Sequence, residues 1–247
     1  MNVCCNVEFG GSLFSRLMLI FQELIFSVND LNSIENIKMN ISDSNFGYIP
    51  NQFNWIYQEN NNVIYDTFIT SKFRGTYTND IPQNDLLKLK IIKSKLIIND
   101  FIINKINNIK SELSLDENCL GVHIRLTDMN SLHPFFGVFS IDDFIRKIEN
   151  EIETKSYSKI FIASDNYQSI CRLKEIFGDK IIFYTDCVRA HNEIDPLPYV
   201  FNYKKLWEDN FIDMFLLSEC STLIHRVSNF ANCSKIYSNT INKVINL

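Results

Sequence analysis

The sequence lacks the features that mark several large protein classes. No two of its seven cysteines form a Cys-x-x-Cys pair, and the number is odd, so neither a disulfide framework nor a structural zinc site is expected. There is no P-loop, no HExxH motif and no Ser–His–Asp arrangement. Positive charge is not in excess either. The net charge of −5 argues against binding to nucleic acid through a basic surface.

Long apolar segments are also missing. The most apolar stretch, residues 13–28, contains Arg16, Gln22 and Glu23, and it is too short and too polar to span a bilayer. No charged region followed by an apolar run and a small-residue cleavage site is found near Met1, so no signal peptide is expected. The unpaired thiols favour a reducing compartment. We therefore expect a soluble, cytoplasmic protein without a transmembrane segment.

The 247 residues, 46% of them hydrophobic, are enough for one large domain or two small ones. The chain begins with a predicted strand at residues 3–9, which Gly10-Gly11-Ser12 ends, and a predicted helix starts at Leu13. The pattern weakens over residues 30–77. Residues 85–115 contain neither glycine nor proline and predict one or two helices.

Strands and helices alternate more clearly in the second half, which predicts an α/β fold with a parallel sheet. Ser140 and Asp143 form a capping box before one helix, and Gly178 ends another. We place a domain boundary near residues 116–118, between an N-terminal part (1–116) and a C-terminal part (117–247). Predicted strands cover residues 120–126, 159–164, 180–185 and 222–227, and predicted helices cover residues 141–152, 167–177, 204–220 and 228–236.

Open parallel sheets bind ligands beyond the carboxyl ends of their strands, so the residues that follow each strand are the candidate site. Two of these turns lead into helix N-termini, whose N–H groups bind anions, and Arg125 adds a two-pronged donor for phosphate oxygens. Together these groups indicate a pyrophosphate pocket without a metal, and a nucleotide sugar as its ligand. The residues are Gly10, Gly11 and Ser12, then Arg125, Thr127 and Asp128, then Ser164, Asp165 and Asn166, and finally Ser228 and Asn229.

Each candidate also has a structural interpretation. The alternative for the glycine pair is a simple turn, and the alternative for Arg125 is an ion pair with Asp128. A histidine inside an apolar strand, such as His123, is more often a hydrogen-bonded core residue. For Asp165, the favoured interpretation is a cap of the next helix. Asp213 stands in an apolar helical run, where a carboxylate needs a partner.

The segment GVHIRLTD (residues 121–128) resembles the GVHxRRTD/HIRRGD motif of the superfamily of α1,2-, α1,6- and protein O-fucosyltransferases, which includes Nod-factor enzymes. Three further segments agree in order. GGSLFSRL (residues 10–17) looks like the family's glycine loop and helix. FIASDN (residues 161–166) and IDMFLLS (residues 212–218), followed by Ser228-Asn229, are similar to its later motifs.

The resemblance implies a GT-B-like fold, in which two Rossmann-like lobes face a cleft. Residues 1–116 would form the acceptor lobe and residues 117–247 the nucleotide-sugar-binding lobe. The implied activity is inverting transfer of fucose from GDP-fucose to a hydroxyl of a glycan or glycoconjugate, with no metal or cofactor. Departures from the family pattern leave two alternatives open, a different nucleotide-sugar donor or a non-catalytic relative. Leu126 replaces the second motif arginine, Met129 a frequent lysine and Asn166 an acidic residue.

From their positions in the motif, the resemblance implies that Arg125 would bind the β-phosphate and stabilise the departing GDP, while Asp128 would orient Arg125. His133 is the candidate base for the acceptor hydroxyl, although a plain loop histidine before Pro134 is slightly favoured. The implied donor-binding set is His123 and Asp213, which would contact guanine, with Asp165, and Gly10, Gly11, Ser12, Ser228 and Asn229, which would contact phosphate or ribose.

Overall fold

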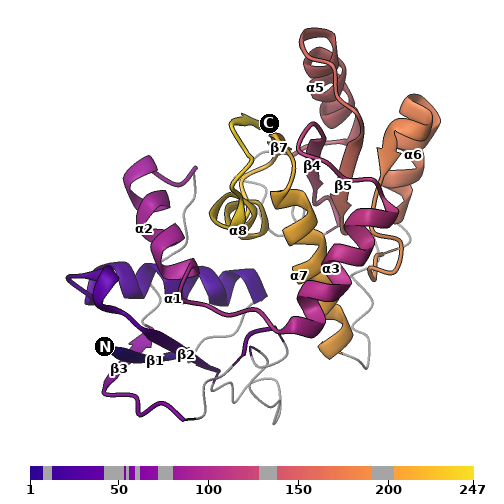
Figure 1. Cartoon of the computed structure of the whole chain (residues 1–247). Helices are drawn as coiled ribbons and strands as arrows, with labels where there is room; N and C mark the ends of the chain where they lie inside the picture. Colours follow the sequence, from indigo (N-terminus) through magenta and orange to yellow (C-terminus); the bar gives the residue numbers. More distant parts are fainter. Residues whose placement is uncertain are drawn as a thin grey trace. The chain divides into compact units, whose positions relative to one another are not determined.

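The computed structural model describes residues 1–7, 13–41, 53, 56–58, 62–71, 80–127, 138–190 and 203–247 (Figure 1). The chain forms two compact units. Unit 1 comprises Met1–Asn104 with Lys235–Tyr237, and unit 2 comprises Lys105–Ser234 with Ser238–Leu247.

The division falls at residue 104, whereas the sequence placed a boundary at residue 116. The reason is helix α3 (Asp100–Glu112), most of which packs within unit 2. Lys105 Nζ lies 3.3 Å from Asp209 Oδ1, and Lys110 forms an ion pair with Glu219. The assignment of acceptor and donor roles to the two parts stays a prediction.

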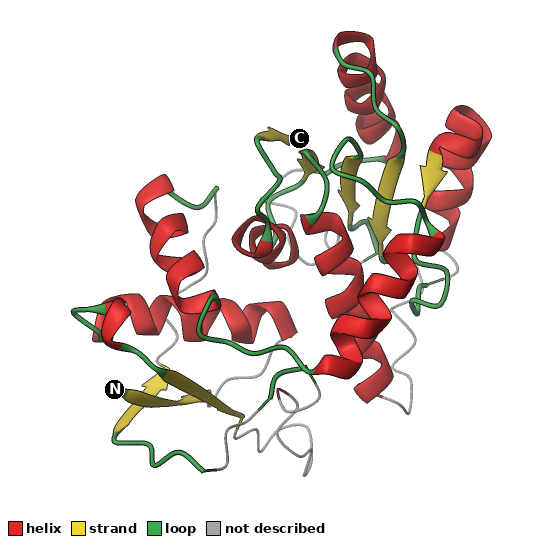
Figure 2. Cartoon of the chain, viewed as in Figure 1, coloured by secondary structure: helices red, strands yellow, loops and turns green. Residues whose placement is uncertain are grey.

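Unit 1 is built on a three-stranded parallel sheet in the order β2-β1-β3 (Figure 2). The central strand β1 (Asn2–Val7) pairs with β2 (Asn36–Ile41) and β3 (Thr67–Ser71). Helix α1 (Leu13–Ser27) packs on this sheet, and α2 (Gln83–Lys93) packs on α1. The predicted first strand and the helix from Leu13 are confirmed, and residues 85–115 contain two helices, α2 and α3.

Unit 2 contains a five-stranded parallel sheet in the order β6-β5-β4-β7-β8. The predicted parallel α/β arrangement is therefore confirmed, although β8 was not predicted, and β4, β6 and β7 are shorter than predicted. The strands are β4 (Leu120–Ile124), β5 (Ile160–Ser164), β6 (Ile181–Ile182), β7 (Thr222–His225) and β8 (Lys243–Asn246). The helices besides α3 are α5 (Ile141–Thr154), α6 (Tyr167–Phe177), α7 (Tyr203–Ser218) and α8 (Asn229–Tyr237), of which the last three residues of α8 are assigned to unit 1.

The ends of two helices in unit 2 follow the local signals in the sequence. At the start of α5, Asp143 Oδ2 accepts a hydrogen bond from the Ser140 backbone N–H at 2.7 Å, as the predicted capping box requires. Gly178 ends α6 with φ of 58°, a conformation that favours glycine.

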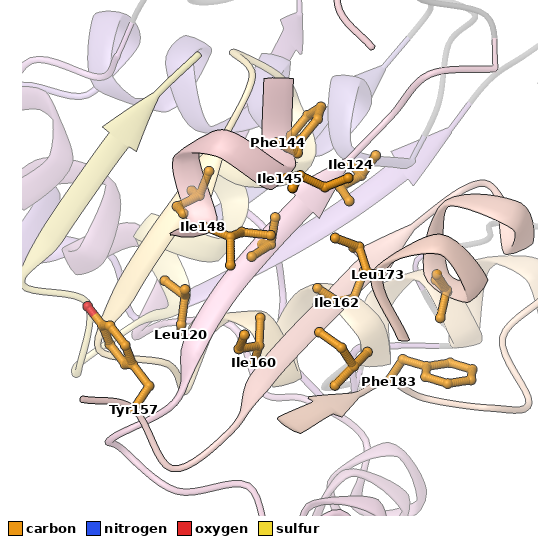
Figure 3. Close-up of a cluster of buried hydrophobic side chains, with 14 of the residues drawn as sticks. Leu120, Ile124, Phe144, Ile145, Ile148, Tyr157, Ile160, Ile162, Leu173 and Phe183 are labelled. Atoms are coloured by element: carbon orange, nitrogen blue, oxygen red, sulfur yellow. The ribbon is translucent and has the colours of Figure 1, made fainter. Parts of the chain in front are cut away.

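One hydrophobic cluster of unit 2 lies on the face of the sheet where α5 and α6 pack against β4 and β5 (Figure 3). Leu120, Val122 and Ile124 alternate along β4 and point into this cluster, as the period of two along a strand requires. Gly121 lies between them and meets α7 on the opposite face, where an added Cβ would be 2.8 Å from Leu217 Cδ1. Helices on both faces bury the sheet, which is typical of parallel sheets.

Candidate functional site

The carboxyl ends of three adjacent parallel strands, β5, β4 and β7, bring most of the described site residues to one edge of the sheet of unit 2, and Asp213 lies in α7. β4 ends at Ile124 and is followed by Arg125. β7 ends at His225 and is followed by Arg226, and helix α8 begins only three residues later. This edge is where an open parallel sheet binds its ligand.

His123 lies in β4 and has only 5% of its surface exposed. Its ring stacks on Phe230 of α8, with centroids 4.4 Å apart and an angle of 7° between the planes. Its Nδ1 atom lies 3.3 Å from Ser228 Oγ. Burial lowers the pKa of His123 well below its ordinary value, and the charges of His225 and Arg125 lower it further. The imidazole is therefore neutral at neutral pH and can offer hydrogen bonds but not charge.

Ser228 is the N-cap of α8, because its Oγ accepts a hydrogen bond from the Ala231 N–H at 3.1 Å. Asn229 is the first residue of the helix. The N–H groups of a first helical turn carry the positive end of the helix dipole and bind anions. Ser228 therefore has a capping role, and the contacts of Ser228 and Asn229 with phosphate or ribose stay predictions.

Asp165 follows β5 and holds the turn after β4. Its Oδ1 accepts a hydrogen bond from the Leu126 N–H at 3.3 Å, and its Oδ2 accepts one from Thr127 Oγ1 at 2.5 Å. The expected role as cap of the next helix is wrong, since Asn166 caps α6 by accepting a hydrogen bond from the Ser169 N–H at 2.8 Å. Asp165 instead fixes the chain immediately after Arg125.

Asp213 lies in α7 and is only 3% exposed. Its Oδ2 accepts a hydrogen bond from Arg189 Nη2 at 3.2 Å, which is the ion-pair partner that its apolar surroundings require. Burial raises the pKa of Asp213 to about 7, while Arg189 opposes that rise and Asp209 adds to it. A contact between Asp213 and guanine stays a prediction, and a base that formed it would share the carboxylate with Arg189.

Five predicted site residues lie outside the described residues. They are Gly10, Gly11, Ser12, Asp128 and His133.

Arg226 is a candidate that the sequence analysis missed. The predicted strand at residues 222–227 placed it inside a strand, whereas β7 ends at His225 and leaves Arg226 at the edge where Arg125 also lies. Its side chain is buried, and the guanidinium lies 4.9 Å from the centre of the Phe139 ring. The signal in the sequence that could have identified Arg226 is its position two residues before the Ser228-Asn229 turn.

Within the described ranges, no group of three or more His, Cys, Asp or Glu side chains is placed to hold a metal ion. All seven cysteines are free thiols. Among the described helices, none has both the length and the apolar composition needed to cross a membrane.

Comparison with solved structures gives the fold. The α-1,6-fucosyltransferase NodZ co-crystallised with GDP has a TM-score of 0.62 and 13% identity, covering 100% of this chain and 94% of NodZ. NodZ soaked with GDP-fucose has a TM-score of 0.56 and 14% identity, and the match covers 96% of this chain and 92% of NodZ. POFUT1 in complex with GDP-fucose has a TM-score of 0.57 and 9% identity, covering 99% and 98%.

This chain has the fold of the GT-B fucosyltransferases. No protein-family model matches the sequence, and no curated protein matches it. The likeness to NodZ and POFUT1 is therefore one of structure, and it extends over nearly the whole of each chain.

Proposed function

We propose that the protein is an inverting glycosyltransferase that transfers fucose from GDP-fucose to a hydroxyl group of a glycan or glycoconjugate. The observation that carries this proposal is the match of nearly the whole chain to fucosyltransferases solved with GDP or GDP-fucose. The placement of Arg125, His123 and Ser228 at the ligand-binding edge of the parallel sheet also supports it.

In an inverting transfer, the acceptor oxygen attacks C1 of fucose while the bond from C1 to the β-phosphate oxygen breaks. Negative charge grows on the departing GDP, and the acceptor hydroxyl loses its proton. Arg125 and the N–H groups of α8 are fixed donors, so they stabilise the growing phosphate charge without rearranging. No metal is needed for that compensation in this proposal.

The remaining roles follow the sequence predictions, except that of Asp165, which comes from its hydrogen bonds to the turn after β4. Neutral His123 contacts the guanine through hydrogen bonds, and Asp165 keeps the turn after Arg125 in place. Asp128 orients Arg125, and His133 is the candidate base that accepts the proton of the acceptor hydroxyl.

A second candidate is transfer from a different nucleotide sugar on the same fold. Two observations favour it. Leu126, at the position of the second motif arginine, is buried in the hydrophobic core of unit 2 and supplies no charge. Asp213, the predicted guanine contact, is already paired with Arg189.

Thermal denaturation with GDP, GDP-fucose, UDP and UDP-glucose separates these functions, together with an assay for donor hydrolysis. We expect GDP and GDP-fucose to raise the melting temperature and UDP ligands to leave it unchanged. Equal shifts with UDP-glucose would exclude the guanine-specific proposal and favour the second candidate. Binding of GDP-fucose with no release of fucose or transfer in the presence of glycan acceptors would mark a non-catalytic relative.

A further inference from the structure

We propose that Arg226 is a second phosphate-binding cation, which acts with Arg125 as a two-arginine clamp on the pyrophosphate of the nucleotide ligand. The clamp rests on the proposed function in that its ligand is a nucleoside diphosphate sugar. The proposal assigns a binding role to the residue that directly follows β7, outside the motif that contains Arg125.

The order of the strands places the two arginines at the same edge of the sheet, with Arg226 level with Ile124 and Arg125 one position further along. β4 and β7 are hydrogen-bonded parallel neighbours, and His123 is the register partner of His225. The chain leaves the sheet at Ile124 on β4 and at His225 on β7. Arg125 and Arg226 are therefore the first residues beyond two adjacent strands at the same edge.

The two charges are close enough to affect each other. Burial lowers the pKa of Arg226, and the charge of Arg125 lowers it further. An anion that lies between two guanidinium groups is attracted by both charges. A pyrophosphate, with oxygens on two phosphorus atoms, offers each guanidinium a two-pronged contact.

Neighbouring groups hold the Arg226 side chain and complete an anion site. The guanidinium lies against the Phe139 ring at 4.9 Å, and only 4% of Arg226 is exposed. A cation on an aromatic ring loses less freedom when it binds a ligand than one in solvent does. Ser228, two residues further along, caps α8 and brings the N–H groups of its first turn to this edge.

The core explains why the second cation comes from β7 and not from β4. The residue after Arg125 is Leu126, which is only 4% exposed and packs in the hydrophobic cluster of unit 2. A charged side chain directed into that cluster would be buried without a ligand. Position 226 lies at the ligand edge, so a cation there can reach a phosphate while the core stays apolar.

Binding measurements with GDP, GMP and inorganic pyrophosphate test the clamp in Arg226→Met, which keeps an unbranched side chain for the Phe139 contact. We expect affinity for GDP and pyrophosphate to fall by roughly tenfold or more, as for a lost charged hydrogen bond, with a smaller loss for GMP. Arg172→Met, on the exposed surface of α6, is the matched control and should bind like the wild type.

Arg226→Lys provides the second variant if Arg226→Met fails to fold. Its ammonium keeps the charge without the fork, so its ratio of GDP to GMP affinity should fall at least threefold. A folded Arg226→Met protein with wild-type affinity for GDP and pyrophosphate would overturn the clamp, while GDP-fucose turnover would still support the proposed function. Pyrophosphate binding that depends on Arg226, without recognition of GDP-fucose, would support the clamp and overturn the proposed function. A wild-type protein that binds neither pyrophosphate nor any nucleoside diphosphate would overturn both.

Discussion

Arg189 and Asp213 form an ion pair in the interior of unit 2, with 3.2 Å between Arg189 Nη2 and Asp213 Oδ2. The same guanidinium donates hydrogen bonds to three backbone oxygens. Nη1 contacts the carbonyls of Tyr184 and Cys187, and Nε contacts that of Ser164. Arg189 thus ties the segment after β6 to the end of β5 and to α7. A carboxylate at Asp213 is retained in an apolar helix because this partner is supplied from 24 residues away.

The stability of the protein should fall between about pH 4 and pH 7 because of Asp213. Its pKa in the folded protein is about 7, against an ordinary value of 3.8, so in this interval the folded chain holds a proton that the unfolded chain has released. Asp213→Asn cannot titrate. We expect the free energy of unfolding of the wild type, relative to the variant, to drop by on the order of a few kcal/mol over this range and to level off above it.

Urea denaturation at several pH values measures this difference. Glu153→Gln, on the exposed side of α5, controls for the loss of one negative charge. A difference between wild type and Asp213→Asn that stays constant or grows with pH would mean that Asp213 is ionised throughout this interval.

Close packing of α7 on β4 should make Gly121→Ala destabilising. The added Cβ would lie 2.8 Å from Leu217 Cδ1 and 3.1 Å from both the Cβ and the Sγ of Cys220, and Leu217 and Cys220 are fully buried. Overpacking of this kind costs about 1–3 kcal/mol in the free energy of unfolding. Gly178→Ala is a useful comparison, because its Cβ would meet nothing within 4 Å and the cost would come from the φ of 58° alone.

Chemical denaturation measures both variants. If Gly121→Ala unfolds at the wild-type midpoint, then α7 and β4 are further apart than the structure places them. An Ile92→Val change in α2 is a small core perturbation in unit 1 and shows the size of an unrelated packing defect.

Local sequence signals predicted most elements of unit 2. In unit 1 they did not predict strand β2. Asn and Lys are rare in strands, so NIKMNI gave no strand prediction, although Ile37 and Met39 are its buried positions. The structure shows what overrides that preference. Asn36 Nδ2 donates to Asn2 Oδ1 at 2.9 Å, and Asn40 Nδ2 donates to Asn6 Oδ1 at 3.2 Å. These are cross-strand pairs whose partners are more than thirty residues away, which a local pattern does not contain.

In the candidate site, too, local sequence signals predicted some features, and features that depend on long-range contacts were missed. Strand ends and turn residues pointed to Arg125, Asp165 and Ser228, because the ligand edge of a parallel sheet follows from strand order alone. The interaction partners of the site residues could not be predicted from the sequence. The Arg189–Asp213 pair and the hydrogen bonds from Asp165 to the turn after β4 depend on tertiary placement. Arg226 was not singled out, because its contact with Phe139 depends on tertiary placement and its only local signal was its position just before Ser228.

Metal removal should leave donor turnover unchanged. The proposed compensation of phosphate charge comes from Arg125, Arg226 and the N–H groups of α8, none of which needs a cation to act. We expect equal rates of GDP release from GDP-fucose with EDTA and with added Mg²⁺ or Mn²⁺. Loss of turnover in EDTA that either metal restores would show that the phosphate site is assigned wrongly.

Arg125 should contribute more to turnover than to ground-state binding, because the charge it contacts grows as GDP departs. Arg125→Ala should lower kcat/KM for GDP-fucose by about 3 kcal/mol or more, the scale for loss of a key electrostatic donor, and mostly through kcat. Arg125→Lys should restore little, since an ammonium lacks the two-pronged geometry. A partnership with Asp128 alone predicts instead a lower melting temperature, with activity lost only in proportion to unfolding. Steady-state kinetics and thermal melts on the same preparations, with Arg172→Ala as control, distinguish the two, and a folded Arg125→Ala enzyme with near-normal donor turnover would exclude the catalytic role.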